Sequence, residues 1–168
     1  MILRALAISA GLLGAAGASQ FPEFSQQYRQ RLGGAVDELA LIVVQFDIDA
    51  AVVGLDRETA LAQLATGGVF GARRAETLRG TFARYNRLRE DLAALEGAGP
   101  FERARMAPAV MDREIARRTL SDYVPAMPLS LEGLSFAAIG FGMLTALVGL
   151  SGRAMRRLLL GRWRRRAA

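Results

Sequence analysis

Two long stretches without charge divide the chain into segments of different character. Residues 5–22 and residues 133–152 contain no Asp, Glu, Lys or Arg. Because an α-helix rises about 1.5 Å per residue, about 20 residues cover the roughly 30 Å hydrocarbon core of a bilayer. We therefore predict transmembrane helices at 5–22 and 130–152, the first being the weaker candidate because it is mostly Ala and Gly. The alternative for the second stretch is a buried helix of a soluble protein, which a chain of 168 residues could hardly enclose.

Between these stretches, apolar residues recur at the helical intervals of three and four. They form two runs: Phe24, Tyr28, Leu32, Ala35, Leu39, Ile42, Phe46, Ala50 and Val53, then Leu78, Phe82, Tyr85, Leu88, Leu92 and Leu95. The runs predict two long amphipathic helices with coiled-coil-like spacing, folded back as an antiparallel hairpin. Since no alternating period of two is long enough for a sheet, the predicted fold class is all-α. Two transmembrane helices would flank a periplasmic helical hairpin or bundle.

Local signals place the ends of the predicted helices. Pro22 suits the first turn of a helix, and the glycines at 67–68 and at 97 and 99 suit turns. Gly33 and Gly34 predict a kink or a close helix approach, and Pro108 predicts a break between two short helices. Capping residues, one C-terminal and three N-terminal, are predicted at Gly54, Asp56, Asp112 and Ser130.

Charge is partitioned sharply along the chain. The formal net charge is +6, yet all 16 acidic residues lie between Glu23 and Glu132, where the balance is slightly acidic. The C-terminal end holds no acid and seven arginines: Arg153, Arg156, Arg157, Arg162, Arg164, Arg165 and Arg166. Positive segments stay on the cytoplasmic side of a span, whereas long segments cross regardless of their charge.

This charge pattern predicts an inner-membrane protein of a bacterium with both termini in the cytoplasm. The expected order is a cytoplasmic N-terminus at 1–4, a span at 5–22, a periplasmic α-helical domain at 23–129, a span at 130–152 and a cytoplasmic tail at 153–168. The arginine tail is expected to fix this topology and to contact anionic lipid. Nucleic acid is not an expected partner, because no domain could read a groove and no aromatic platform is present.

Composition removes several kinds of chemistry. The chain has no Cys and no His, and all 22 basic residues are Arg. Disulfides, thiolate nucleophiles, imidazole bases and lysine Schiff bases are therefore excluded. Asp47, Asp49, Asp56 and Glu58 form the densest acidic cluster, but their spacing is not that of a calcium loop and fits a solvated helix end. We expect no catalytic residue, no cofactor and no metal.

Small residues form a predicted packing seam in both candidate spans. The seam comprises Ser135, Ala138, Gly142, Thr145, Gly149 and Gly152 in the second span and Ala7, Gly11 and Ala15 in the first, with Gly14 and Ala18 beside them. Small side chains let another backbone approach closely, either between the two spans or between protomers. The competing interpretation is that such residues are common in any Ala-rich membrane helix.

Several sequence blocks together resemble a known bacterial family. The blocks are SQFPEF at 19–24, QQY at 26–28, QRLGGAVDEL at 30–39, GPFER at 99–103, PL at 128–129 and EGL at 132–134. They are similar to the inner-membrane family called domain of unknown function 2937, over nearly the whole chain. The resemblance implies a short two-span membrane protein with a helical middle, and it implies no activity. It also disfavours cleavage after Ala18, because the resemblance runs across that point.

Two functions of different class remain open. The first is a structural or adaptor protein that forms a homo- or hetero-oligomer, with Gln26, Gln27 and Arg31 as the candidate partner surface. The second takes Ala16 to Ala18 as a signal-peptide cleavage site and gives a C-terminally anchored binding protein for a lipid or hydrophobic ligand. A membrane enzyme that uses only carboxylates and Arg ranks last, because the sequence places no pair of catalytic groups together.

Overall fold

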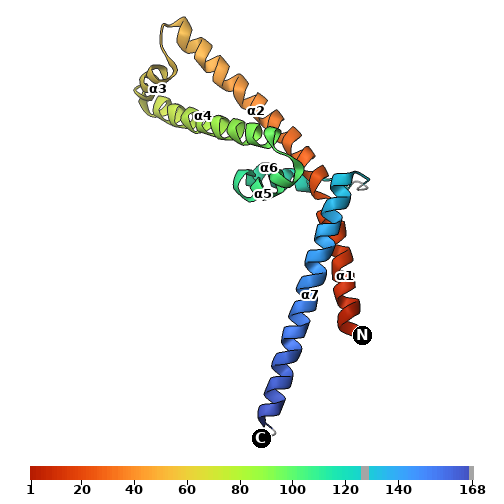
Figure 1. Cartoon of the computed structure of the whole chain (residues 1–168). Coiled ribbons are helices and arrows are strands. Elements are labelled where there is room, and N and C mark those ends of the chain that lie inside the picture. The colour runs from red at the N-terminus through yellow and green to blue at the C-terminus, as the bar shows by residue number, and fades with distance from the viewer. Residues whose placement is uncertain (126–128, 167–168) are drawn as a thin grey trace. The chain divides into compact units, whose positions relative to one another are not determined.

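The computed structural model describes residues 1–125 and 129–166, with the side chains of the last helix described through Arg156. Helices account for nearly all of these residues. Within those residues the helices are α1 (Ile2–Ala18), α2 (Phe21–Val52), α3 (Arg57–Ala65), α4 (Gly68–Gly97), α5 (Pro100–Val110), α6 (Arg113–Ser121) and α7 (Leu131–Arg166) (Figure 1). The described residues contain no strand, so the predicted all-α class is confirmed. The chain divides into unit 1, residues 1–25 and 124–168, and unit 2, residues 26–123.

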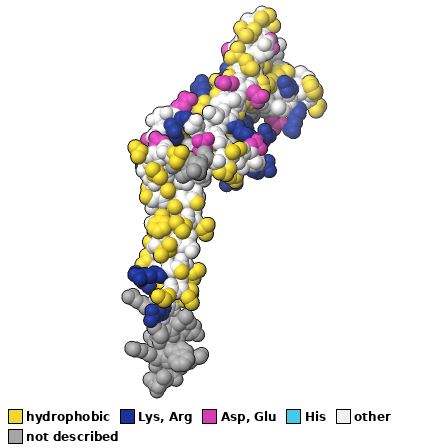
Figure 2. Space-filling view, turned by 90° about the vertical axis from the view of Figure 1, so that its right-hand side faces the viewer, with side chains coloured by type: hydrophobic (Ala, Val, Ile, Leu, Met, Phe, Trp, Pro, Cys, Tyr) yellow, Lys and Arg dark blue, Asp and Glu magenta, His cyan; other side chains and the backbone are white. Residues whose placement is uncertain are grey.

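Unit 1 consists mainly of α1 and α7, which lie side by side (Figure 1). Two helical stretches are long and apolar enough to cross a membrane: Ile2–Val52, which begins with α1 and continues into α2, and Leu131–Arg156 in α7. Their outward side chains are largely hydrophobic, and Figure 2 shows charged side chains only toward the two ends of this pair. Helix α7 continues beyond the predicted span as far as Arg166.

A tight connection separates α1 from α2. The backbone N–H of Ser19 donates to Ala15 O at 3.0 Å, and that of Gln20 donates to Gly17 O at 3.2 Å. Pro22 then occupies the first turn of α2, where its missing N–H costs no helical hydrogen bond. The sequence prediction for Pro22 is confirmed, and the first helix ends four residues earlier than the predicted boundary at 22.

In unit 2 the chain reverses direction at α3, and α2 and α4 pack through two clusters of buried side chains. The first cluster joins Tyr28, Leu32 and Val36 of α2 to Leu88 and Leu95 of α4 and to Ile115 of α6. The second joins Val43 of α2 to Leu61, Leu78 and Phe82 of α3 and α4. Early α2 thus lies near late α4, and later α2 near early α4. Their burial supplies the main stabilisation of this unit, because each large apolar side chain contributes about 1.5–3 kcal/mol.

Predicted caps are found where local chemistry calls for them. Gly54 has a φ of +74°, a conformation that only glycine adopts without strain. Asp56 accepts a hydrogen bond from the backbone N–H of Thr59 at 2.8 Å. Asp112 accepts from the N–H groups of residues 114 and 115, and Ser130 from that of residue 133. All four predictions are confirmed.

Of the two alternatives predicted at Gly33 and Gly34, the close helix approach is wrong. A Cβ at Gly33 would meet only Leu92 Cδ2 at 4.0 Å, and one at Gly34 would meet nothing within 4 Å. The predicted break near Pro108 between two short helices is confirmed: Pro108 lies in the last turn of α5, and the chain breaks at 111–112, where Asp112 caps the next helix.

The predicted α2 stripe is partly misplaced. Ile42 and Val53 are exposed, whereas Val36 and Val43 are buried. The cause is the position of α3 and α6, which cover a face of α2 that apolar spacing alone does not single out.

Candidate functional site

The backbones of α1 and α7 come close together at Gly14 and Gly140. A Cβ placed on Gly14 would collide with the carbonyl oxygen of Gly140, and a Cβ on Gly140 would collide with the carbonyl oxygen of Gly14. The exclusion is therefore reciprocal, and the obstacle on each side is backbone rather than a movable side chain. Neither position tolerates a side chain while the helices keep this separation.

Further contacts extend the α1–α7 interface in both directions. A Cβ on Gly11 would meet Thr145 Oγ1 and the ring of Phe141, and one on Gly152 would meet the side chain of Leu3. At the opposite end, the rings of Phe21 and Phe136 stack with centroids 5.5 Å apart. Thr145 Oγ1 is buried, and the described residues give it no hydrogen-bond partner.

The predicted small-residue seam is only partly in this interface. Thr145, Gly149, Gly152, Ala7, Gly11 and Ala15 are buried or half-buried, whereas Ser135, Ala138 and Gly142 are exposed. The buried positions of early α7 are instead Gly133, Phe136 and Gly140.

The exposed members stay a prediction for packing between protomers, and they differ from the α1–α7 contact in their repeat. The contacting face of α7 advances in steps close to four residues, which is the spacing of one helix ridge, whereas the predicted seam alternated three and four. Gly140, which contacts the backbone of Gly14, does not fit the alternating pattern and was not predicted.

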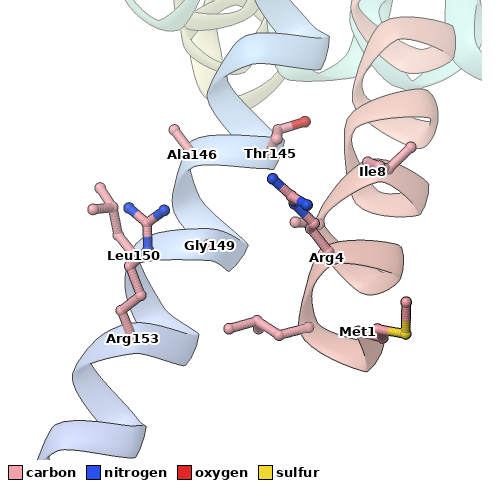
Figure 3. A pocket seen from close by; sticks show the side chains of 10 residues that line it. Met1, Arg4, Ile8, Thr145, Ala146, Gly149, Leu150 and Arg153 are labelled. Carbon is pink, nitrogen blue, oxygen red and sulfur yellow. The ribbon is translucent and has the colours of Figure 1, made fainter.

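A groove of about 620 Å³ lies between the ends of α1 and α7 that carry Arg4 and Arg153 (Figure 3). Its remaining lining is mostly apolar: Met1, Leu3, Ala7, Ile8, Thr145, Ala146, Gly149 and Leu150. Figure 3 shows the guanidinium of Arg4 leaning from α1 toward α7, while the side chain of Arg153 runs beside Leu150. A Cβ on Gly149 would meet nothing within 4 Å, so the space beside this glycine is open.

The arginine tail is described only at its start. Arg153 and Arg156 are exposed on α7, and the described residues form no ion pair with either. The side chains of the other predicted lipid-contacting residues, Arg157, Arg162, Arg164, Arg165 and Arg166, lie outside the described part.

The predicted partner surface at the start of α2 is partly engaged within the chain itself. Arg31 Nη2 donates to Asp122 Oδ2 at 2.8 Å, which ties α2 to the end of α6. This hydrogen bond lowers the pKa of Asp122. Gln26 is exposed, while Gln27 is half-buried and already makes an interaction.

A network of charges fastens α6 to α4 and α2. Arg84 lies 3.7 Å from Asp112 and 3.5 Å from Glu114, and Arg87 lies 3.4 Å from Asp112. The backbone N–H of Asp112 donates to the Tyr28 hydroxyl at 2.8 Å, and burial raises the pKa of that hydroxyl. Burial also raises the pKa of nearby Asp91. Arg84, Arg87, Asp112, Glu114 and Tyr28 each contact another member of the network, and these contacts hold α6 against α4 and α2.

The acidic cluster spans the end of α2 and the start of α3, and three of its four members make hydrogen bonds within the chain. Arg57 Nε donates to Asp47 Oδ1 at 2.7 Å, and this bonding lowers the pKa of Asp47. Asp49 accepts from the Gln45 amide at 2.9 Å, and the cap hydrogen bond from Thr59 lowers the pKa of Asp56. Among the described residues, no three acidic side chains converge in a way that could hold a metal ion.

An exposed apolar surface on α2 has no counterpart in the described structure. Four residues at intervals of three and four, Leu41, Val44, Ile48 and Val52, are 73%, 54%, 51% and 80% exposed, and we call them the α2 outer stripe. Hydrophobic side chains also gather at the upper end of Figure 2, where Figure 1 places the end of α2. Sequence reasoning missed the stripe because it assigned the apolar residues of α2 to a single inner face.

Comparison with known proteins adds a family to this geometry. The family model described as "Protein of unknown function (DUF2937)" matches residues 2–160, which covers both units. The chain belongs to this family. The match to DUF2937 confirms the resemblance that the sequence blocks indicated. No curated protein and no solved structure matches the chain significantly.

Membership in DUF2937 indicates a relationship but no activity, because the family's function is unknown. Its match extends from α1 into α7 and so includes helices of both units.

Proposed function

We propose that this DUF2937 chain is a two-span protein of the bacterial inner membrane, with α1 and α7 crossing the bilayer and both termini in the cytoplasm. Unit 2 would then lie in the periplasm and serve as a non-catalytic docking module for a partner protein. The chain would act as an adaptor, holding that partner at the membrane.

The anchor half of the proposal draws support from the α1–α7 contact. Reciprocal packing of Gly14 on Gly140 gives α1 a specific partner within the chain, which a cleaved signal peptide would not need. The family match beginning at residue 2 points the same way. The all-arginine end after the second candidate span favours a cytoplasmic C-terminus.

The docking half rests on the α2 outer stripe. Four large apolar side chains on one face of a helix cost free energy in water unless another surface covers them. Their spacing is that of an amphipathic helix interface, and a second apolar helix would fit against it.

Charge beside the stripe indicates what kind of partner fits. Glu38 and Asp49 are exposed along one border of the stripe, and Asp37 is exposed at its start. Two stripes facing each other would bring these carboxylates together, and like charges across an interface are unfavourable. We therefore propose a different protein whose apolar surface has basic residues beside it.

The test compares partner capture by the full chain and by variants in its own membrane. We would replace Val44 and Ile48 together by Gln, and as a matched control replace the exposed Leu120 of α6 by Gln. After in-membrane cross-linking and purification, the stripe variant should recover at least about tenfold less of the partner that the wild type recovers. The control should recover it at the wild-type level.

Other outcomes would contradict the docking proposal. Equal capture by the wild type and the stripe variant would remove the stripe from the interface. If capture is lost only when Gln26, Gln27 and Arg31 are replaced together, the partner-binding surface lies at the start of α2. Capture of a second copy alone would make the protein a homo-oligomer instead.

The competing function, a cleaved binding protein for a hydrophobic ligand, finds less support in unit 2. A cavity between α2, α4 and α6 is lined by Arg31, Glu38, Arg84, Glu114 and Arg118 beside its apolar residues, so a hydrophobic ligand would have to sit against charges. Intact-mass measurement decides between the two. A mass that corresponds to a chain beginning at Met1 supports the anchored adaptor, and a mass that corresponds to a chain beginning at Ser19 contradicts it.

A further inference from the structure

The groove between α1 and α7 combines two features that otherwise lie apart in unit 1. Its walls are mostly apolar and include the small residues Ala146 and Gly149, whereas its rim carries Arg4 on one helix and Arg153 on the other. The carboxylates nearest in sequence to these two arginines are Glu23 and Glu132, about 20 residues away from each. Among the described residues, neither Arg4 nor Arg153 forms an ion pair.

The position of the two arginines matches one edge of a bilayer. Arg153 comes directly after the 20 uncharged residues that end at Gly152, a length of roughly 30 Å in a helix. Arg4 lies in the first turn of α1 and borders the same groove. If α1 and α7 cross a membrane, as proposed above, both guanidinium groups lie at the depth of lipid phosphates and the groove extends toward the acyl chains.

We propose that this groove is a binding site for one phospholipid with a negatively charged headgroup. Its phosphate would lie between the Arg4 and Arg153 guanidinium groups, because guanidinium donates paired hydrogen bonds to phosphate oxygens. One acyl chain would run along Ala7, Ala146 and Leu150 and fill the space that Gly149 leaves open. Charge complementarity selects an anionic lipid over a zwitterionic one, and the apolar walls select a lipid over free phosphate.

The inference rests on the proposed membrane insertion and is independent of the α2 outer stripe. The full chain is extracted in mild detergent from its membrane fraction. Native mass spectra are then recorded with equal amounts of phosphatidylglycerol and phosphatidylcholine of identical acyl chains, and separately with inorganic phosphate. A chain absent from the membrane fraction would contradict the proposed function. A chain present there without lipid selectivity would contradict only the lipid site.

Two pairs of variants locate the site. Arg4→Gln with Arg153→Gln removes both charges, and Arg156→Gln removes one exposed charge of the same tail that does not line the groove. Gly149→Leu fills the hollow, and Gly142→Leu adds the same side chain to an exposed position with nothing within 4 Å. We expect one bound phosphatidylglycerol, weakened about twentyfold by the double arginine change. Gly149→Leu should also displace it, and both controls should keep it.

Several results would overturn the site. Equal weakening by Arg156→Gln would mean diffuse attraction to the tail, and equal binding of phosphatidylcholine would remove the headgroup selectivity. Binding of inorganic phosphate alone at the lipid's affinity would make the groove a phosphate site. Loss of a protein partner, with lipid binding unchanged, on Gly149→Leu would show that a helix from another chain occupies the groove.

Discussion

At position 140 the space available to a side chain is already occupied by the backbone of another helix. The carbonyl oxygen of Gly14 lies where a Cβ of residue 140 would be placed. Two residues along α7, Gly142 has nothing within 4 Å of the same atom. A methyl group added to these two glycines therefore meets opposite environments on the same helix.

We predict that Gly140→Ala and Gly142→Ala change stability in opposite directions. The first forces α1 and α7 apart and should destabilise the full chain by about 1–3 kcal/mol. The second should stabilise it by up to about 1 kcal/mol, because Ala favours a helix over Gly. Thermal unfolding followed by circular dichroism in detergent measures both. Equal effects of the two changes would show that the close contact does not exist.

A second residue-scale prediction concerns the hydroxyl of Thr145. Its oxygen is buried and has no hydrogen-bond partner among the described residues. A buried polar group without a partner costs free energy. Thr145→Val should therefore leave the free energy of unfolding unchanged or raise it by about 1 kcal/mol at most. Thr145→Ser keeps the hydroxyl and serves as the control. A clear loss of stability in the Val variant would mean that the hydroxyl is hydrogen-bonded after all.

At the scale of elements, the end of α2 is tied to α3 by the Asp47–Arg57 pair. Both side chains remain partly exposed, so the pair is expected to contribute no more than about 1 kcal/mol. Because Arg57 lowers the pKa of Asp47, this stability is present above the pKa of an unfolded Asp, about 4, and is lost as the pH falls through the lowered value.

The corresponding prediction is a pH-dependent effect of Asp47→Asn. At pH 7 the variant should melt below the wild type, and the gap should close as the pH drops below about 4. Asp49→Asn, which removes a carboxylate bonded only to Gln45, provides the control for a general loss of charge. A gap that stays constant from pH 7 to pH 3 would show that the carboxylate charge at 47 does not stabilise this end of the hairpin.

Features that depend only on residues near in sequence could be predicted, and features that depend on contacts between helices could not. The caps at Asp56 and Asp112 satisfy backbone groups within three residues, so sequence alone located them. The buried face of α2 and the tight contact at Gly140 depend on where another helix lies, which spacing does not determine. The exact end of α5 lies two residues after Pro108, at Val110, so the proline located the break only approximately.

For the whole molecule, the prediction to test is topology. The chain has no Cys, so single cysteines can report exposure without a background. Cys at exposed Ala62 of α3 should react with a membrane-impermeant thiol reagent applied to intact spheroplasts, and Cys at exposed Ala154 of α7 should react only after lysis. The reverse pattern would place unit 2 in the cytoplasm. Reaction at both sites before lysis would contradict two spans.

The reciprocal contact of Gly14 and Gly140 also constrains how the chain can change over time. Most harmful large-for-small replacements can be rescued by a smaller residue on the opposing surface. Here the opposing residue is itself glycine and the obstacle is its carbonyl oxygen, so no smaller residue could replace it. Suppressors of Gly140→Ala should therefore never arise at codon 14. They should map to positions that let the whole of α1 or α7 move, so the lineage must keep both glycines or abandon this pairing altogether.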